Sequence, residues 1–236
     1  MKRIIALLLA LMLVFALCAC GDKSDSANTP ENEKNEVKTQ ESTDKPHKEE
    51  KGQKSENSGF ELGTVKGVTY ENKSLGIGIK VESGWRLLTE DELYETMGIV
   101  ADTYDNDEIR DIIMNSGTFY DMMALTQGVE NINIAVEKLA PSLAAKYSTE
   151  DYAKAGLENL PAAYASAGIE LVSSEITTVD FAGEEHTAIL THIVNQGVEM
   201  YSLCIVFKCG NYFANVTITA ATETGVYEIA DMFYAL

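Results

Sequence analysis

Four consecutive runs of β-branched and aromatic residues dominate the C-terminal half of the chain. They cover residues 170 to 181, 184 to 195, 198 to 209 and 212 to 220, and they are separated by Ala182-Gly183, Gln196-Gly197 and Gly210-Asn211. Glycine in a two-residue connection is the usual sign of a β-hairpin, because tight hairpin turns need positive φ angles. The pattern predicts four antiparallel strands joined by three hairpins.

The last hairpin fixes its own register. With Gly210-Asn211 as the turn, Phe207, Ile205, Leu203 and Tyr201 face Ala214, Val216, Ile218 and Ala220, in that order. One face is then apolar on both strands, as a correct register requires. The other face carries Ile189, Ile193, Met200 and Val206. We therefore expect both faces of this sheet to be covered.

The same register separates the two cysteines of this region. Cys204 and Cys209 lie five residues apart on one strand, so their side chains point to opposite faces, about 17 Å apart. A disulfide needs Cα atoms within about 7 Å. Although an oxidising compartment would favour a bond, we expect two free and largely inaccessible thiols.

Capping boxes predict where two helices begin. Thr89 with Glu92 and Ser148 with Asp151 each precede apolar residues at helical spacing, and the second helix should stop near Gly168. The segments "GVTYE", "IGIKV", "TFYDMMAL" and "NINIAVEKL" are predicted strands.

Two further helices are expected. One should begin at Asp105 and turn Ile109, Ile112 and Ile113 inward, and the last should run from about residue 225 to residue 233. The sum is an α+β fold whose mainly antiparallel sheet has helices on both faces.

Several motifs resemble those of PsbP-like domains, which are extrinsic photosystem proteins and their bacterial relatives. The segment "VTYENKSLGIGIKVESGW" has a Tyr-x-Asn pair, a glycine-flanked strand and a Gly-Trp, while "VDFAGEEHTAI" and "YSLCIVFKCGNYFANVTITA" are similar to that group's central hairpins. These hairpins are also similar to clostridial-type surface lipoproteins. The resemblance covers most of residues 68 to 236, and it implies an α/β/α sandwich. Because the members of the group are chiefly non-catalytic, it implies little chemistry.

The N-terminus has the layout of a secretory signal peptide. Lys2 and Arg3 precede sixteen apolar residues, 4 to 19, and this run is too short to favour a membrane span. Leu17-Cys18-Ala19-Cys20 resembles the bacterial lipobox, which implies that residues 1–19 are removed and that Cys20 is the lipid attachment site. Two or more acyl chains, such as palmitate, would anchor the chain stably to the cell membrane.

The next segment, residues 20–58, is predicted to be a disordered tether after its lipidated cysteine. Between Gly21 and Ser58 there is no aromatic residue, and Val37 is the one aliphatic residue larger than alanine. Such a chain cannot bury enough apolar surface to offset the entropy of ordering. Residues 59–236 have the usual size of one globular domain.

The expected domain is strongly acidic. It holds nine Lys and Arg against 27 Asp and Glu. Nucleic acid is excluded as a partner because phosphate binding needs basic patches, and an anionic membrane surface would repel the domain. Contact with the membrane is therefore expected through the N-terminal lipid alone.

No motif specifies a reaction, a cofactor or a metal. His186 and His192 are six residues apart on one predicted strand, about 20 Å, so they cannot share a metal ion. We interpret them as structural residues of the sheet whose hydrogen-bonding groups are satisfied. The acidic stretch from residue 102 to residue 111 contains the weak metal candidates Asp102, Asp105, Asp107 and Glu108. It lacks the spacing and the glycine of a calcium loop, so acids that favour a helix N-terminus are the preferred interpretation.

These observations predict a lipid-anchored extracytoplasmic binding or assembly module that is not an enzyme, with an envelope protein or a small ligand as its partner. One alternative is a single-lobed solute-binding lipoprotein. The other is a surface enzyme that uses carboxylates, which a pair of strongly shifted carboxyl pKa values in one cleft would favour.

Replacing the predicted lipid attachment site tests the localisation. Cys20→Ala removes the thiol that would be acylated, so incorporation of a labelled fatty acid should be abolished and signal removal slowed or blocked. Labelling and immunoblotting of the mutant and the parent measure both effects. Equal labelling of the two proteins would contradict the lipoprotein interpretation.

Overall fold

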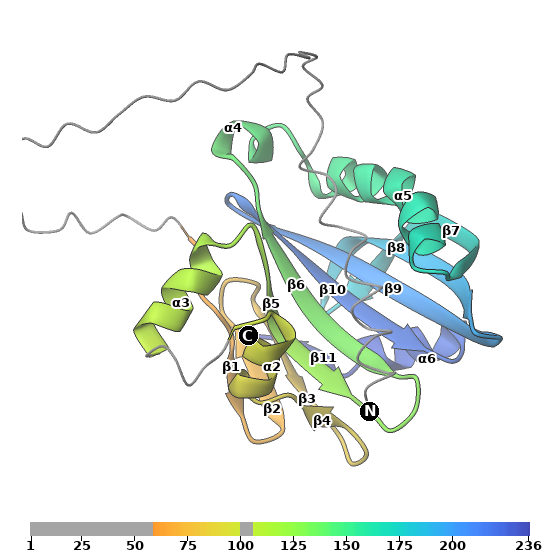
Figure 1. Ribbon diagram of the computed structural model, residues 1–236, viewed down its shortest axis with the longest axis horizontal. Helices are drawn as coiled ribbons and strands as arrows, with labels where there is room; N and C mark the ends of the chain where they lie inside the picture. Colours follow the sequence, from red (N-terminus) through yellow and green to blue (C-terminus); the bar gives the residue numbers. More distant parts are fainter. Residues whose placement is uncertain (1–58, 100–105) are drawn as a thin grey trace, which may run out of the picture.

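The computed structural model describes residues 59–99 and 106–236. Two sheets and five helices make up this part of the chain (Figure 1). The strands of the large sheet are β4 (Arg86–Leu87), β5 (Thr118–Leu125), β6 (Asn131–Lys138), β7 (Glu170–Phe181), β8 (Glu184–Asn195), β9 (Val198–Cys209) and β10 (Tyr212–Ala220). The small sheet contains β1 (Thr64–Lys66), β2 (Thr69–Asn72), β3 (Ile77–Lys80) and β11 (Phe233–Ala235). The helices are α2 (Glu90–Thr96), α3 (Asn106–Asn115), α4 (Pro141–Ala144), α5 (Thr149–Ser166) and α6 (Glu223–Ala230).

The four predicted C-terminal strands are confirmed with the bounds that the sequence indicated, as β7 to β10. Their turns use positive φ angles at Ala182, Gly183, Gln196, Gly197 and Gly210. The predicted register is also confirmed, because Phe207 pairs with Ala214 and Leu203 with Ile218. The large sheet has the order β4-β5-β6-β10-β9-β8-β7, and all its pairs are antiparallel. The predicted α+β class with a mainly antiparallel sheet is therefore confirmed.

Both faces of the large sheet are covered, as their apolar residues required. On one face, α5 packs against β7, β8 and β9, and the buried residues there include Leu160, Ile193 and Val206. On the other face, α6 packs against β9 and β10. The small sheet lies on this second side too, because Tyr70 and Ile79 share one apolar core with Ile134 and Val216. In Figure 1, α2, α3 and the small sheet group together at the end of the molecule opposite α5.

The segments "GVTYE" and "IGIKV" do form strands, β2 and β3, but in a separate sheet. The last helix was predicted to reach residue 233 and this is wrong, because α6 ends at Ala230 and Phe233 begins β11. Pairing with β3 stabilises the extended conformation of β11. The ring of Tyr234 lies over Gly78, where an added Cβ would come within 2.6 Å of ring carbons. A larger residue at position 78 would displace the Tyr234 ring.

The two capping boxes are confirmed at the N-termini of α2 and α5, where Thr89 and Ser148 accept from the backbone of Glu92 and Asp151. α3 buries Ile109 and Ile113. The prediction for Ile112 is wrong, since 38% of this residue is exposed. The predicted cap, Asp105, lies outside the described residues.

Cys204 and Cys209 are free, and they face opposite sides of β9, as predicted. Cys204 is buried under α5, and burial raises the pKa of its thiol to about 12. The expectation of inaccessibility is wrong for Cys209, which lies near the sheet margin and is only partly buried, with its Sγ 3.3 Å from the carbonyl oxygen of Gly59.

The two thiols should therefore react at different rates with iodoacetamide at pH 8. Because its pKa is about 12 in place of 9, the fraction of Cys204 present as thiolate falls roughly a thousandfold. Burial also blocks access of the reagent. Cys209 should be alkylated in the folded protein, and Cys204 only after denaturation. Mass spectrometry can assign the label, because cleavage after Lys208 separates the two cysteines. Equal labelling of the folded protein would contradict the assigned faces.

Candidate functional site

A β-bulge on β5 turns one carboxylate toward the small sheet. The pairing of β5 with β6 shifts between Tyr120 and Met122, so Asp121 is the extra residue. An extra residue bends the strand and re-aims its side chain. The Asp121 side chain therefore departs from the alternating side-chain orientation of β5 and points toward β2. Only 7% of the residue is exposed there.

Three donors from the small-sheet side bind this carboxylate. The backbone N–H of Gly63 donates to Oδ1 at 2.9 Å, and Asn72 Nδ2 donates to Oδ2 at 2.6 Å. The hydroxyl of Tyr70 also donates to Oδ2. The Tyr-x-Asn pair of the sequence, Tyr70 and Asn72, is thus the pair of side chains that holds Asp121.

Burial controls the protonation of this cluster. It raises the pKa of Asp121, while the hydrogen bonds from Tyr70, Gly63 and Asn72 act in the opposite direction. Burial and the neighbouring carboxylate raise the pKa of Tyr70 well above its ordinary value, so its hydroxyl keeps its proton at neutral pH.

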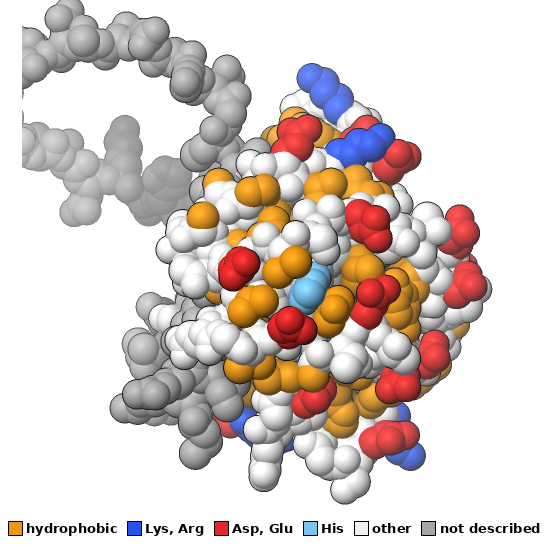
Figure 2. Space-filling view, turned by 90° about the vertical axis from the view of Figure 1, so that its right-hand side faces the viewer, with side chains coloured by type: hydrophobic (Ala, Val, Ile, Leu, Met, Phe, Trp, Pro, Cys, Tyr) orange, Lys and Arg blue, Asp and Glu red, His pale blue; other side chains and the backbone are white. Residues whose placement is uncertain are grey.

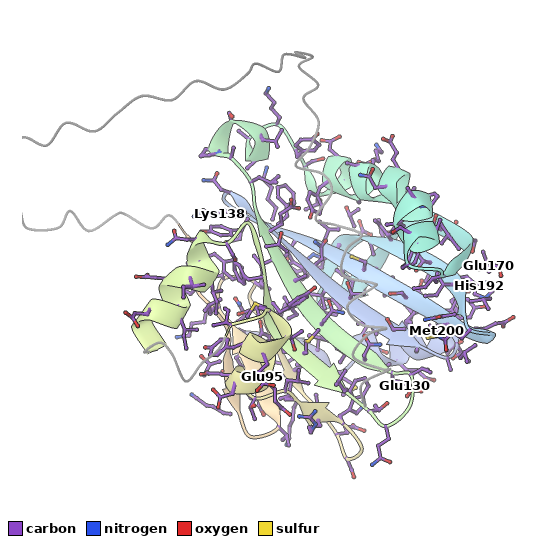
Figure 3. All side chains as sticks on the ribbon, viewed as in Figure 1. Glu95, Glu130, Lys138, Glu170, His192 and Met200 are labelled. Atoms are coloured by element: carbon purple, nitrogen blue, oxygen red, sulfur yellow. The ribbon has the colours of Figure 1, made fainter. Side chains whose placement is uncertain are left out.

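A groove with a volume of about 490 Å³ opens above Asp121, and we call it the Asp121 groove. Its walls come from the segment before β1, from β1 and β2, from the β2–β3 connection, and from α2, α3 and β5. In Figure 3, Glu95 marks α2 beside this region. The charged lining residues are Lys66, Lys73, Arg110, Glu61, Glu71, Glu90 and Asp121 itself. This volume lies within the range of small-molecule sites.

A second cavity lies beneath α5, on the opposite face of the large sheet. Of the eleven buried polar or charged residues in the described part of the chain, nine lie on this face: Asn131, Asn133, Glu137, Thr191, Asn195, Ser202, Asn215, Thr217 and Thr219. Glu130 and Lys138, labelled in Figure 3, mark the two ends of β6 along which three of them lie.

Tyr152 of α5 links two of the polar side chains of this face, Glu137 and Asn215, by hydrogen bonds. Tyr152 stacks on Phe213 with ring centroids 4.4 Å apart and donates to Glu137 at 2.6 Å. Asn215 donates to the Tyr152 hydroxyl at 3.1 Å. Burial raises the pKa of Glu137, and the hydrogen bond that Tyr152 donates to Glu137 opposes the shift. The cavity itself is about 30 Å³, which is room for water rather than for an organic ligand.

His186 and His192 both pack against aromatic rings. His186 packs against Phe207 with centroids 4.3 Å apart, and burial lowers its pKa. His192 stacks on Tyr201 at 4.4 Å. Its Nε2 atom has no hydrogen-bond partner among the described residues, so the expectation of a satisfied histidine is wrong for His192.

The acidic candidates fall partly outside the described residues. This is the case for Asp102 and Asp105 and for the side chain of Asp107, while Glu108 lies exposed on α3. Within residues 59–99 and 106–236 no three His, Cys, Asp or Glu side chains are grouped closely enough to hold a metal ion. Figure 2 shows acidic side chains scattered among apolar ones on one face of the molecule.

Little in the sequence indicates the groove. Its cations, Lys66, Lys73 and Arg110, come from β1, the β2–β3 connection and α3, and no spacing in the sequence relates them. The available signals are Asp121, the one acid in the mainly apolar and aromatic strand "TFYDMMAL", and the Tyr-x-Asn pair of Tyr70 and Asn72.

Comparison with known proteins gives no assignment. A scan against protein-family models finds no match, and a search of the curated proteins finds none either. In the described part of the chain, no helix is both long enough and apolar enough to cross a membrane.

Replacing Asp121 tests its role in joining the sheets. In Asp121→Asn an amide nitrogen at one oxygen position would face donors, so the free energy of unfolding should fall by about 1–3 kcal/mol. Burial raises the folded-state pKa of Asp121, so ionisation works against folding as pH rises from near 4 through that higher value. Because asparagine does not titrate, the deficit of the mutant should be largest near pH 4 and shrink toward pH 7. Urea denaturation across this range measures it.

Asp180→Asn is the matched control, because Asp180 is exposed on β7. Its unfolding free energy should change by less than about 0.5 kcal/mol. Equal losses in the two mutants, or a deficit of Asp121→Asn that grows with pH, would contradict the assigned role.

Proposed function

We propose that this protein is a lipid-anchored, extracytoplasmic, non-catalytic module that binds a small ligand in the Asp121 groove. In this proposal residues 1–19 are the signal peptide, Cys20 carries the lipid, and residues 20–58 tether the domain of residues 59–236 to the membrane. The observation that carries the binding function is the groove of about 490 Å³ above a carboxylate with three hydrogen-bond donors.

The fold supports an α/β/α arrangement of the PsbP-like kind as part of this proposal. α5 covers one face of the large sheet, and α6 packs on the other, where α3 contributes Ile109 and Ile113 to the core. PsbP-like proteins are chiefly non-catalytic, so the resemblance favours binding. The small sheet adds a wall to the groove, and a single lobe then suffices for a site.

The positions of the shifted carboxyl groups favour binding over carboxylate catalysis. Burial raises the pKa of both Asp121 and Glu137. Asp121 lines the groove, whereas Glu137 lines the cavity on the opposite face of the sheet. A pair of acids must flank one substrate to act together as acid and base, and these two carboxyl groups do not share a cleft.

Blocking the groove tests the function. Thr64 is exposed on β1 and lines the groove without contacting Asp121 in any hydrogen bond, so Thr64→Trp should fill the groove and leave the fold intact. A thermal-shift screen of the mature chain against anionic, neutral and cationic small molecules should find compounds that raise Tm, since a ligand at 100 times its Kd stabilises by about 2.7 kcal/mol. Thr64→Trp should abolish these shifts.

Thr178→Trp places the same bulk at an exposed position of β7, away from the groove, and should retain every shift. The proposal is wrong if no compound stabilises the wild-type chain, or if Thr64→Trp responds to the compounds as fully as Thr178→Trp does.

A further inference from the structure

The distribution of positive charge in the domain is uneven. Between Gly59 and Leu236 there are nine Lys and Arg against 27 Asp and Glu. Three of the nine, Lys66, Lys73 and Arg110, line the Asp121 groove. The groove therefore holds a third of the domain's cations on a small part of its surface.

These three cations have no ion-pair partner in the described structure. The ion pairs formed within residues 59–99 and 106–236 are Arg86–Glu92 and Lys154–Glu150, and neither involves the groove. Cations in an acidic protein would gain from pairing with the abundant carboxylates. Instead they line an open groove, where an incoming ligand can reach them.

The carboxylates of the groove are placed differently. Glu71 accepts from the Tyr234 hydroxyl at 3.2 Å, and Glu90 lies in the first turn of α2, where the helix dipole favours negative charge. The Asp121 oxygens already accept from three donors. Burial raises the pKa of Asp121, and the positive charge of Arg110 also acts on this carboxylate and opposes the rise. Three of the four groove carboxylates therefore have stabilising neighbours, whereas none of the three cations forms an ion pair in the described structure.

We infer that the Asp121 groove binds a small organic anion, with a carboxylate or phosphate group held by Lys66, Lys73 and Arg110. This inference rests on the proposed function and adds the chemical class of the ligand. The planar guanidinium of Arg110 can bind such a group through two parallel hydrogen bonds, and the lysines add two mobile ammonium groups. The surrounding surface is acidic and repels anions, so affinity must come from these short-range contacts.

The same argument sets a limit on the ligand. Glu61, Glu71 and Glu90 also line the groove, so a polyanion that extends along the walls would meet like charges. A molecule with one or two anionic groups fits this arrangement better than a polyanion such as nucleic acid.

Matched probes test the inference on the mature chain. Succinate and glycerol 3-phosphate are the anions, succinamide and glycerol are their uncharged counterparts, and 1,4-diaminobutane is a cation of similar size to succinate. Calorimetry should detect binding of at least one anion, and its uncharged counterpart should bind at least about tenfold more weakly, since hydrogen bonds to charged groups contribute more than neutral ones.

Three variants locate the binding. Lys66→Gln, Lys73→Gln and Arg110→Gln should each raise the Kd of the bound anion about tenfold or more, because each removes a charge-assisted contact. Lys146→Gln is the control, since Lys146 is exposed outside the groove and its loss changes the net charge equally. Its Kd should stay within about twofold of wild type because a distant surface charge is screened by salt.

The outcomes separate this inference from the proposed function. Binding of succinamide, glycerol or 1,4-diaminobutane that is as tight as binding of the anions, and that Thr64→Trp abolishes, would keep the groove as a site and overturn the anion. Equal weakening by Lys146→Gln and the groove variants would overturn the three cations as ligands. If none of the anions binds at 10 mM, the inference is wrong, and the broader screen with Thr64→Trp then decides whether the binding function survives.

Discussion

The carboxylate of Asp121 joins the two sheets through hydrogen bonds, and the shape of the groove depends on that junction. A bulge on β5 supplies the carboxylate, and Gly63, Tyr70 and Asn72 supply its donors. Hydrogen bonds are directional, whereas apolar packing alone tolerates sliding of one sheet on the other. Asn72 extends the junction, because its Nδ2 also donates to the carbonyl of Glu61 at 3.2 Å and its Oδ1 accepts from the Leu75 N–H at 2.9 Å. The segments that carry the groove's walls are thereby tied to one buried group.

The two faces of the large sheet bury different kinds of side chain. Toward the small sheet the buried residues of β6 and β10 are apolar, and they form a continuous core with Tyr70 and Phe233. Toward α5 the same strands present amides, hydroxyls and the carboxyl group of Glu137. Buried polar groups cost free energy unless they find partners, and Tyr152 on α5 provides one for both Glu137 and Asn215. The network beneath α5 thus fixes this helix on the sheet, while the open groove on the other side stays available to a ligand.

Charge gives the proposed site its selectivity. A domain with three acids for every base repels anions over most of its surface. The groove places three cations without ion-pair partners in the described residues beside its four acids, and these cations come from elements that only the fold brings together. An anion bound there would be recognised by contact geometry rather than by long-range attraction.

The sequence by itself determined the local structure. Period-2 patterns and glycine turns predicted β7 to β10 and their register, and capping boxes predicted the starts of α2 and α5, because these features depend on residues close together in the chain. It could not separate the small sheet from the large one, since short strands such as β2 and β3 have the same local pattern whichever neighbour they pair with. Only the tertiary structure placed Phe233 in a strand beside β3, and turned Asp121 toward Tyr70 and Asn72. It alone gathered Lys66, Lys73 and Arg110, because contacts between residues far apart in sequence are decided by how the faces of sheets and helices pack, which no local pattern records.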